Sequence, residues 1–260
     1  MDAFSLDNKN IFITGATGDI GKNFMKAFAK RKPKTVFTFS SKQERLDNLK
    51  STFSDLNIKG IPCDLRTEEG NHKMVDFVKR EVGNETIDLV IFLAGNLGVR
   101  GEQAFPTWEQ AQQCMELNAL SPTFCFKRMM ELSLLKKGTC VLAAGSIAGH
   151  ISYPEAQNIS IYSMSKAALH RAVMNWATDH PEMTIFELAF GAVRTTMLDE
   201  CRPPGMTKKE WKEELMSEIP IQEITDPEVL GETVVQILET PGYRLFHGEV
   251  LHLSGGEHIT

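Results

Sequence analysis

Tyr162 and Lys166 stand four residues apart, a spacing that puts both side chains on one face of a helix, one turn from each other. A free phenol has a pKa of about 10 and exchanges protons poorly near neutral pH. A nearby ammonium favours the phenolate and lowers that pKa. A lowering by about 3 units takes roughly 4 kcal/mol, which a cation in a partly dry cleft can supply. The pair therefore predicts an acid–base group, although Tyr-x-x-x-Lys also occurs by chance on solvated helix faces.

A glycine-rich loop near the start of the chain strengthens the chemical interpretation. Residues 10–14 form a short apolar run typical of a buried strand, and a helical pattern begins at about Phe24. Between them lies the segment Gly15-Ala16-Thr17-Gly18-Asp19-Ile20-Gly21. A strand, a glycine-rich turn and a helix, in that order, are the context that a dinucleotide-binding loop requires. Glycines let the backbone approach a pyrophosphate, and the helix N-terminus offers free N–H groups. The alternative is a structural turn that binds nothing.

The remaining pattern alternates strands and helices, which must position these residues. Further strands are expected at 35–40, 58–63, 89–93, 139–144, 184–189 and 249–253. Helices are expected after Ser41, at about 67–82, at about 107–135 with a bend near Pro122, after Tyr162, and at about 227–239. Near-continuous apolar strands predict a parallel sheet covered on both faces. We therefore expect an α/β fold: one doubly wound, Rossmann-type, seven-stranded domain over residues 1–260, with its ligand at the carboxyl ends of the strands.

Composition narrows the class of protein. The 260 residues carry a net charge of −6, which argues against a nucleic-acid partner or an anionic membrane surface. No apolar run approaches the roughly 20 residues that span a bilayer, and the N-terminus shows no secretory signal. The five cysteines are odd in number and form no Cys-x-x-Cys pair. They predict reduced thiols in a cytoplasmic protein.

The ordered motifs along nearly the whole chain resemble the short-chain dehydrogenase/reductase family. The resemblance rests on Thr14-Gly15 to Gly21, Asp64-Leu65, Ala94-Gly95, Asn118, Ser146 to Gly149, Tyr162-x-x-x-Lys166, Gly191 to Thr195 and Ser254-Gly255-Gly256. It implies that Tyr162 is the catalytic acid or base, and that Lys166 lowers the tyrosine pKa and binds the nicotinamide ribose. It further implies that Ser146 hydrogen bonds to the substrate oxygen and that Asn118 holds a water in a proton relay.

The resemblance also implies a set of cofactor contacts and an assembly. Asp64 would contact the adenine and Thr195 the carboxamide. The full cofactor-binding set is Gly15, Thr17, Gly18, Asp19, Ile20, Gly21, Ser40, Ser41, Lys42, Asp64, Leu65, Ala94, Gly95, Tyr162, Lys166, Gly191, Val193 and Thr195. A homo-oligomer, a tetramer or a dimer, is expected, since the helices at about 107–135 and 160–178 carry more apolar residues than one sheet face needs.

Four positions depart from the usual family pattern. Asp19 stands where the middle glycine is usual, a spacing closer to the extended members of the family. The Asn-Ala-Gly signature begins with Leu93, the Pro-Gly after the sixth strand begins with Phe190, and Ser254 replaces an acid before the final glycines. All four concern cofactor packing or strand ends, and none removes a catalytic side chain.

The end of the second strand predicts a preference for NADP(H) over NAD(H). NAD-binding proteins place a carboxylate there for the ribose hydroxyls. This strand ends in Ser40-Ser41-Lys42, and no acid follows before Glu44, which should lie inside the next helix. Two hydroxyls, a cation and a helix N-terminus suit a 2′-phosphate. Alternatively, Lys42 is merely solvated.

The favoured function is an NADP(H)-dependent oxidoreductase that interconverts a small-molecule carbonyl and alcohol by hydride transfer. The first alternative is a non-catalytic nucleotide-binding regulator or scaffold on the same fold. The second is an epimerase or dehydratase of the extended type, suggested by the glycine spacing alone. No metal site is expected, because His247, His252 and His258 lack a ligand spacing and an acidic or thiol partner.

The variable segments at 96–106, 150–160 and 195–220 should form the substrate site. The candidate pocket walls are Phe105, His150, Tyr153, Met197 and Trp211, which suggest a partly apolar ligand. Residues 195–220 look mobile, with Pro203-Pro204-Gly205 and few apolar anchors, and we expect them to act as a lid that excludes water.

Overall fold

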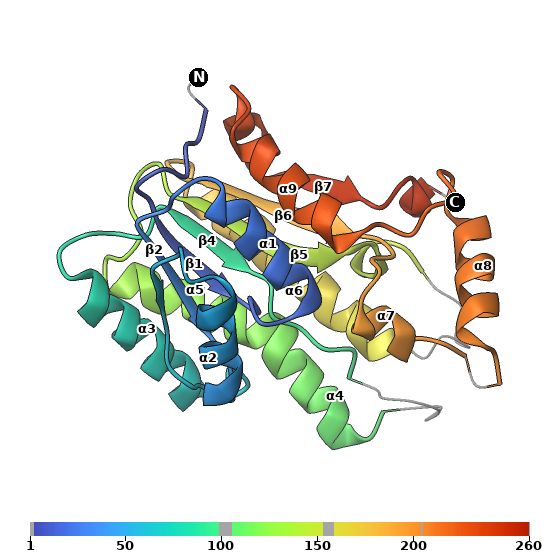
Figure 1. The fold of residues 1–260 in the computed structure, drawn as a ribbon. Helices are drawn as coiled ribbons and strands as arrows, with labels where there is room; N and C mark the ends of the chain where they lie inside the picture. Colours follow the sequence, from blue (N-terminus) through green and yellow to red (C-terminus); the bar gives the residue numbers. More distant parts are fainter. Residues whose placement is uncertain (1–2, 99–105, 153–158, 204, 260) are drawn as a thin grey trace.

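A seven-stranded parallel sheet forms the centre of the molecule (Figure 1). The computed structural model describes residues 3–98, 106–152, 159–203 and 205–259. The strand order is β3-β2-β1-β4-β5-β6-β7, and every neighbouring pair is parallel. The strands are β1 (Asn10–Thr14), β2 (Thr35–Phe39), β3 (Ile58–Lys59), β4 (Leu89–Phe92), β5 (Cys140–Ser146), β6 (Thr184–Phe190) and β7 (Val250–Leu253). The expected fold class and topology are confirmed.

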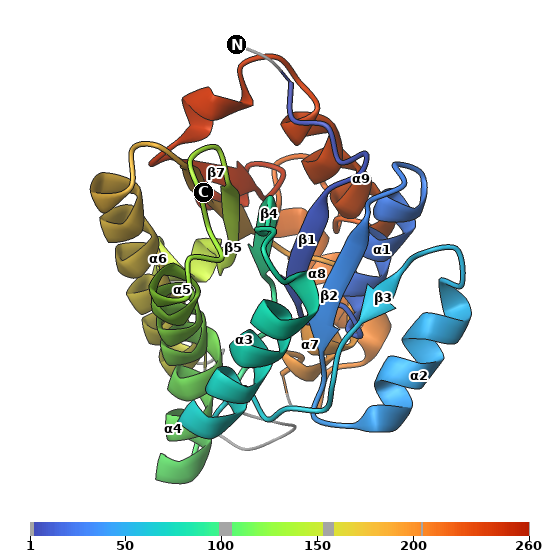
Figure 2. The ribbon, with the colours of Figure 1, turned by 90° about the vertical axis from the view of Figure 1, so that its left-hand side faces the viewer.

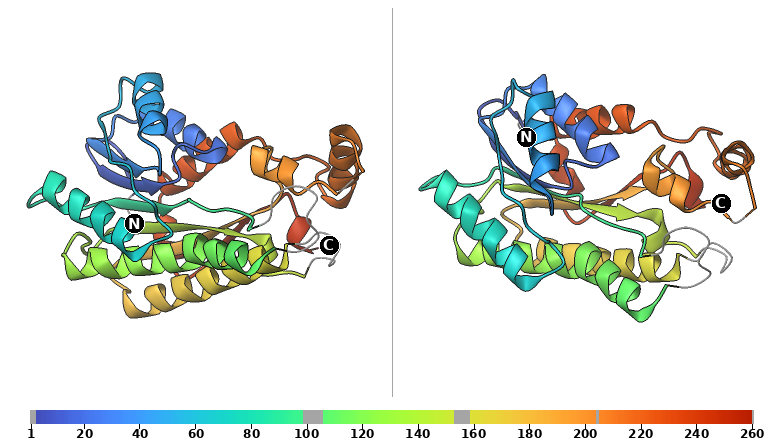
Figure 3. Two further views of the ribbon diagram at one scale, coloured as in Figure 1. Left: turned by 90° about the horizontal axis from the view of Figure 1, so that it is seen from below. Right: turned by 60° about the horizontal axis from the view of Figure 1, so that its bottom comes forward.

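Helices cover both faces of the sheet, as the edge-on views show (Figure 2; Figure 3). One face carries α1 (Asp19–Ala29), α2 (Gln43–Thr52) and α9 (Pro227–Leu238). The other carries α3 (Glu68–Val82), α5 (Ser121–Glu131) and α6 (Ser160–Asp179). Successive strand residues supply alternate faces: Ile11 and Ile13 pack with the first layer, and Phe12 packs with the second. Burial on both faces explains why the strands are apolar at nearly every position.

The chain reverses its direction of travel across the sheet between β3 and β4. It proceeds from β1 outward to β2 and β3, and then returns to place β4 on the other side of β1. In open parallel sheets, ligands bind outside the carboxyl ends of the strands at such a switch point. The fold therefore directs attention to the residues that follow β1 and β4.

Two expected elements differ in the structure. The strand expected at 58–63 is regular only at Ile58–Lys59 and then makes an isolated bridge between Ser40 and Pro62. A proline carries no N–H for a ladder, which accounts for the early end. The long helix expected over 107–135 is divided into α4 (Trp108–Met115), a π-helical turn (Glu116–Leu120) and α5.

Pro122 explains where that helix changes. In a regular α-helix, the N–H of residue 122 would bond to the carbonyl of Asn118, four residues earlier, and proline has no N–H to donate. The turn widens there, and the Ser121 N–H bonds to the Glu116 carbonyl, five residues earlier. Single π-helical turns of this kind often occur at functional sites.

The segment after β6 contains two short helices, α7 (Thr196–Glu200) and α8 (Lys208–Glu218). They share a small apolar cluster in which Trp211 and Leu215 are buried against Ala192. The expectation of few apolar anchors in this segment is therefore wrong for α8. Within the described part of the chain, no helix is long and apolar enough to cross a bilayer. All five cysteines are unpaired thiols.

Candidate active site

The glycine-rich loop is packed so closely that Gly15 and Gly21 cannot be replaced without movement. Gly15 has a φ of +75°, and a Cβ there would lie 2.8 Å from the Ala94 nitrogen. A Cβ at Gly21 would lie 2.2 Å from the Gly15 oxygen. The Thr14 hydroxyl accepts hydrogen bonds from the N–H groups of Leu93 and Ala94 at 3.0 and 3.1 Å. The loop after β1 is thus bound to the segment after β4, at the switch point.

Helix α1 begins directly after this loop and presents its N-terminus there. Its N-cap, Gly18, has no side chain to satisfy the first N–H groups, so these groups and the helix dipole are available to an anion. A tight glycine turn followed by a free helix N-terminus fits a pyrophosphate. Thr17 and Ile20 are half-buried beside it.

Asp19, the residue that departs from the glycine pattern, connects the loop to the predicted lid. Its carboxylate accepts a hydrogen bond from the Thr196 N–H at 2.7 Å. Thr196 is the first residue of α7, so one contact joins the first turn of α1 to a segment 177 residues later in the chain. Sequence reasoning assigned Asp19 to the cofactor alone.

The end of β2 is arranged as expected for a phosphate site. Ser40 is buried, Ser41 and Lys42 are exposed, and α2 starts at Gln43, so Glu44 lies inside the helix. Among the described residues, the Lys42 ammonium makes no ion pair or hydrogen bond. The two hydroxyls, the ammonium and the helix N-terminus are adjacent in the sequence. No carboxylate of the described residues pairs with the ammonium.

Asp64 is more strongly engaged than the sequence suggested. The Arg66 guanidinium donates to both carboxylate oxygens, at 2.9 and 2.7 Å, and holds the Asp64 pKa below its usual range. Arg66 also donates to Gln113 on α4 at 3.0 Å. Leu65 is buried. Any adenine contact by Asp64 would therefore be shared with Arg66, which sequence reasoning missed.

Asn118 lies in the π-helical turn and is buried, and its side chain is fully bonded to the protein. Its Oδ1 accepts from the Asn96 N–H at 2.9 Å, while Nδ2 donates to the Asn96 carbonyl at 2.8 Å and to the Ser165 hydroxyl at 2.9 Å. A Cβ at Gly95 would lie 3.2 Å from Asn118 Oδ1 and 3.5 Å from Lys166 Nζ. The Asn118 side chain thus fixes the segment after β4 to the π-helical turn.

Tyr162 and Lys166 share one face of α6, as their spacing predicted, and Ser146 joins them from β5. The Lys166 ammonium lies 5.6 Å from the centre of the Tyr162 ring and donates to the Ala144 carbonyl at 2.7 Å. Ser146 ends β5 and lies within hydrogen-bonding contact of the Tyr162 hydroxyl. Strand β5 and helix α6 therefore hold all three side chains.

The expected lowering of the tyrosine pKa is wrong for the protein in this state. Burial raises the pKa of Tyr162 above its usual value, and the hydrogen bond with Ser146 opposes this only in part. Burial also lowers the pKa of Lys166 to about 8, while the charges of Glu187 and Cys114 act in the opposite direction. Desolvation of both groups outweighs their mutual influence. At neutral pH the phenol is protonated and is set to donate a proton.

A cavity of about 180 Å³ opens above these side chains. Its polar lining comprises Ser146, Tyr162, Lys166, Thr195 and Glu257, and most of the remaining lining is apolar, including Ile20, Leu97, Ile147, Ile159, Met197, Leu198, Trp211 and Leu215. Gly95, Gly191 and Val193 also line it.

The candidate pocket walls divide into three groups. Met197 and Trp211 line the cavity as expected. His150 is not among its lining residues and instead bonds to Glu187. Phe105 and Tyr153 lie outside the described residues. Sequence reasoning missed Glu257, whose carboxylate accepts from the Ala192 N–H at 2.9 Å and supports the wall at Gly191.

The chain is similar to known proteins over most of its length. A family model described as short chain dehydrogenase matches residues 9–204. The oxidoreductase YmfI of Bacillus subtilis is 26% identical over 96% of this chain and 99% of its own length. The 7alpha-hydroxysteroid dehydrogenase of Escherichia coli K12 is 25% identical over 98% of this chain and 96% of its own. Among solved structures, the Pseudomonas aeruginosa RhlG/NADP complex superimposes with a TM-score of 0.85 at 20% identity, covering 99% of both chains.

Proposed function

The chain belongs to the short-chain dehydrogenase/reductase family, and from this membership we propose that it interconverts a carbonyl and an alcohol by hydride transfer, with NADP(H) as the favoured cofactor. The observation that carries the proposal is the meeting of Ser146, Tyr162 and Lys166 at one cavity, beside a glycine cradle that fits a pyrophosphate. The fold alone would not assign a reaction, because one fold serves many functions.

Each side chain has a role that follows from its surroundings. The nicotinamide supplies the hydride when the cofactor is bound. Ser146 holds the substrate carbonyl oxygen next to Tyr162. Tyr162, kept protonated by burial, donates its proton to that oxygen as charge develops there. Lys166 stabilises the phenolate that forms, and its bond to Ala144 fixes the ammonium in place.

The end of β2 supports NADP(H) as the cofactor. Ser40, Ser41 and Lys42 present donors where a 2′-phosphate would lie, and the first acid, Glu44, is inside α2. The structurally similar RhlG was solved with NADP. Lysine binds phosphate as a point charge without the bidentate fork of arginine, so a moderate preference is expected.

The cavity supports an apolar carbonyl compound as the substrate. Its walls present Leu97, Ile147, Met197, Leu198 and Trp211, while its polar side chains include the three catalytic groups. Such a pocket binds the body of a ligand by burial and orients one oxygen by hydrogen bonds. A related protein of comparable length is named for action on a hydroxysteroid, which is a largely apolar compound.

Turnover with a reduced nicotinamide tests the proposal. We expect the protein to oxidise NADPH in the presence of at least one member of a panel of cyclic ketones, steroid ketones and acyl thioesters. Tyr162→Phe should lower the rate by about 10² to 10⁴, because the phenol oxygen transfers the proton. Its affinity for NADPH, measured by fluorescence, should stay close to that of the wild type, because the ring remains.

The non-catalytic alternative gives a different result. A regulator would bind NADPH but would oxidise none of the panel, and Tyr162→Phe would then change nothing measurable. A wild-type rate in Tyr162→Phe, on a substrate that the wild type converts, would exclude the proposed role of the tyrosine. We further propose a cytoplasmic location, which the unpaired cysteines support, and a homo-oligomeric assembly.

A further inference from the structure

Glu187 is a carboxylate in the interior of the sheet. It lies in the middle of β6, paired in register with Ala143 on β5 and Val250 on β7, and it is 0% exposed. Its side chain passes over Gly145, where a Cβ would lie 1.7 Å from Oε1. A buried carboxylate is costly unless positive or hydrogen-bonding groups surround it. The groups that surround Glu187 should therefore reveal its purpose.

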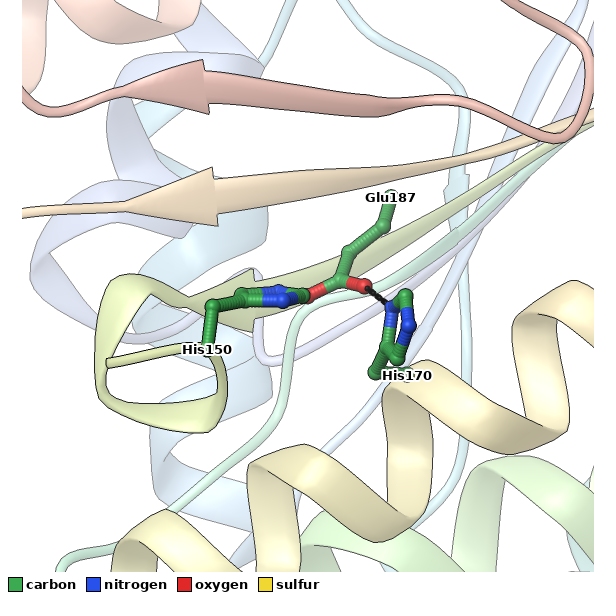
Figure 4. Close-up of side chains that lie close together, drawn as sticks. All are labelled: His150, His170 and Glu187. Carbon is green, nitrogen blue, oxygen red and sulfur yellow. Dashed lines mark hydrogen bonds and ion pairs between the residues drawn. The ribbon is translucent and has the colours of Figure 1, made fainter. Parts of the chain in front are cut away.

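Two histidines from different elements approach the two oxygens of this carboxylate (Figure 4). His150, which follows the short 3-10 helix after β5, places Nε2 2.9 Å from Oε1. His170, one turn after Lys166 on α6, places Nδ1 2.7 Å from Oε2. The two rings are 4.6 Å apart between their centres and nearly perpendicular. Three separate segments thus converge on one point.

The convergence has the dimensions of a metal site. One nitrogen from each histidine and one oxygen of Glu187 all lie within 4.8 Å of one another. Tetrahedral ligands bound to zinc at about 2.0–2.1 Å lie about 3.3 Å apart. The nitrogen–oxygen distances of 2.9 and 2.7 Å are slightly shorter than this. Widening these two separations by roughly half an ångström would bring the ligand atoms to the spacing of a zinc site.

We propose that His150, His170 and Glu187 form a binding site for one divalent transition-metal ion of the zinc class. Two imidazole nitrogens and a carboxylate oxygen suit zinc, cobalt or nickel, whereas magnesium and calcium prefer oxygen ligands alone. Three protein ligands leave a position for water or a fourth ligand. The His252 ring is close to that of His150, at 5.5 Å between centres.

Charge and access both favour an ion. Glu187 is a buried carboxylate whose direct partners are two imidazoles, and a divalent cation between them would offset the cost of burying its charge. The histidine side chains are 17% and 24% exposed, so an ion can reach the site from solvent, while the glutamate is closed off. The proposal departs from the sequence-based expectation of no metal site, which had weighed only His247, His252 and His258.

The simpler alternative is a hydrogen-bonded cluster in which each imidazole donates one N–H to Glu187. This alternative predicts no affinity for metals. Two substitutions distinguish the metal site from the hydrogen-bonded cluster. His150→Gln and His170→Asn each place an amide N–H close to the position of the imidazole nitrogen that contacts Glu187 in the wild type. They preserve donors for the carboxylate but remove good metal ligands.

The test uses the full-length protein after treatment with a chelator. Titration with Zn²⁺ by calorimetry and with Co²⁺ by visible absorption should each give one ion per chain, and the Co²⁺ complex should show intense d–d bands of low coordination number. His150→Gln and His170→Asn should each weaken binding by about tenfold or more, as losses around a metal commonly do. Zn²⁺ should raise the unfolding temperature of the wild type but not of these variants.

Two control variants make the result specific. His180→Asn alters a histidine that has a carboxylate partner, Glu182 at 3.3 Å, but belongs to no ligand cluster in the described structure. Cys201→Ser removes the one thiol that is only partly buried. Both should bind Zn²⁺ like the wild type. The proposal is overturned if the wild type binds no stoichiometric ion, if the cluster variants bind as tightly as the wild type, or if Cys201→Ser abolishes binding. No substrate is involved, so the result is independent of the proposed reaction.

Discussion

The Lys166 ammonium donates a hydrogen bond of 2.7 Å to the main-chain carbonyl of Ala144. Ala144 stands two residues before Ser146 on β5, so the strand that supplies the catalytic hydroxyl also fixes the catalytic cation. The ammonium is buried, which lowers its pKa to about 8. The Lys166 side chain is therefore fully protonated only in the lower part of the physiological pH range.

This relationship predicts an alkaline limit to carbonyl reduction. The Lys166 ammonium is present below pH 8 and is lost as the pH rises through that value, whereas the raised pKa of Tyr162 keeps the phenol protonated. We expect kcat/KM for reduction, which reports the free enzyme, to fall about tenfold per pH unit above roughly pH 8. Lys166→Arg, which stays charged, should be less active but should retain its rate to higher pH. A decline at the same pH in both proteins would assign the limit to another group.

Lys42→Asp should reverse or erase the preference for NADPH. The ammonium at the N-cap of α2 attracts a 2′-phosphate, and a carboxylate there repels it. We expect NADPH affinity to fall by roughly tenfold or more, the worth of a charged hydrogen bond, while NADH affinity is kept or improved. Fluorescence titration of both cofactors measures this. Lys127→Asp, an exposed change on α5, should leave both affinities unaltered. Equal affinities in the wild type would contradict the assignment.

The segment that carries α7 and α8 should become better protected from amide exchange when both ligands are bound. The Thr196 N–H bonds to Asp19 beside the cofactor loop, and the cavity is lined from this segment by Met197 and Trp211. We expect amide exchange in α7 to slow with cofactor plus substrate, and exchange in α9 to stay constant. Asp19→Ala should speed exchange at Thr196 in the free protein, since the acceptor is lost. Equal exchange in α7 with and without ligands would rule out a lid.

A homo-oligomer should form through the helical layer that contains α4, α5 and α6. Phe124 on α5 and Met164 on α6 are 50% and 58% exposed, which is costly for large apolar side chains in a monomer. We expect light scattering at micromolar concentration to give a multiple of the 29.1 kDa chain mass. Phe124→Glu should shift the mass toward the monomer. Val229→Glu, an equally exposed site on α9 across the sheet, should not. A wild-type monomer would contradict the expectation.

The strand order and the meeting of Tyr162, Lys166 and Ser146 were predictable because they follow from local signals. Apolar runs and glycine turns indicate the strands, and the four-residue helical spacing brings Tyr162 near Lys166. The rules for parallel crossovers then limit the possible strand orders. The short β3 and the π-helical turn lie beside Pro62 and Pro122, each of which removes one backbone N–H donor. The sequence locates both prolines, but the backbone geometry that results depends on the neighbouring chain.

Other parts of the site depend on contacts between segments remote in the sequence. Arg66 beside Asp64, Asp19 beside Thr196, and Glu187 between two histidines involve side-chain directions that periodicity does not encode. The tyrosine pKa was predicted with the wrong sign because spacing reports the nearness of the lysine and does not report the extent of burial. Burial proved to be the larger influence on both groups.

Gly145 and Glu187 constrain the order in which this sequence can change over generations. With Glu187 present, any side chain at position 145 collides with a carboxylate that two histidines hold in place. Once Glu187 is replaced by a smaller residue, that obstacle disappears. Of the two mutational routes to a chain lacking both residues, only the one that loses the glutamate first avoids this collision. Position 145 therefore stays glycine as long as Glu187 is present, whereas a change at position 187 does not first require a change at position 145.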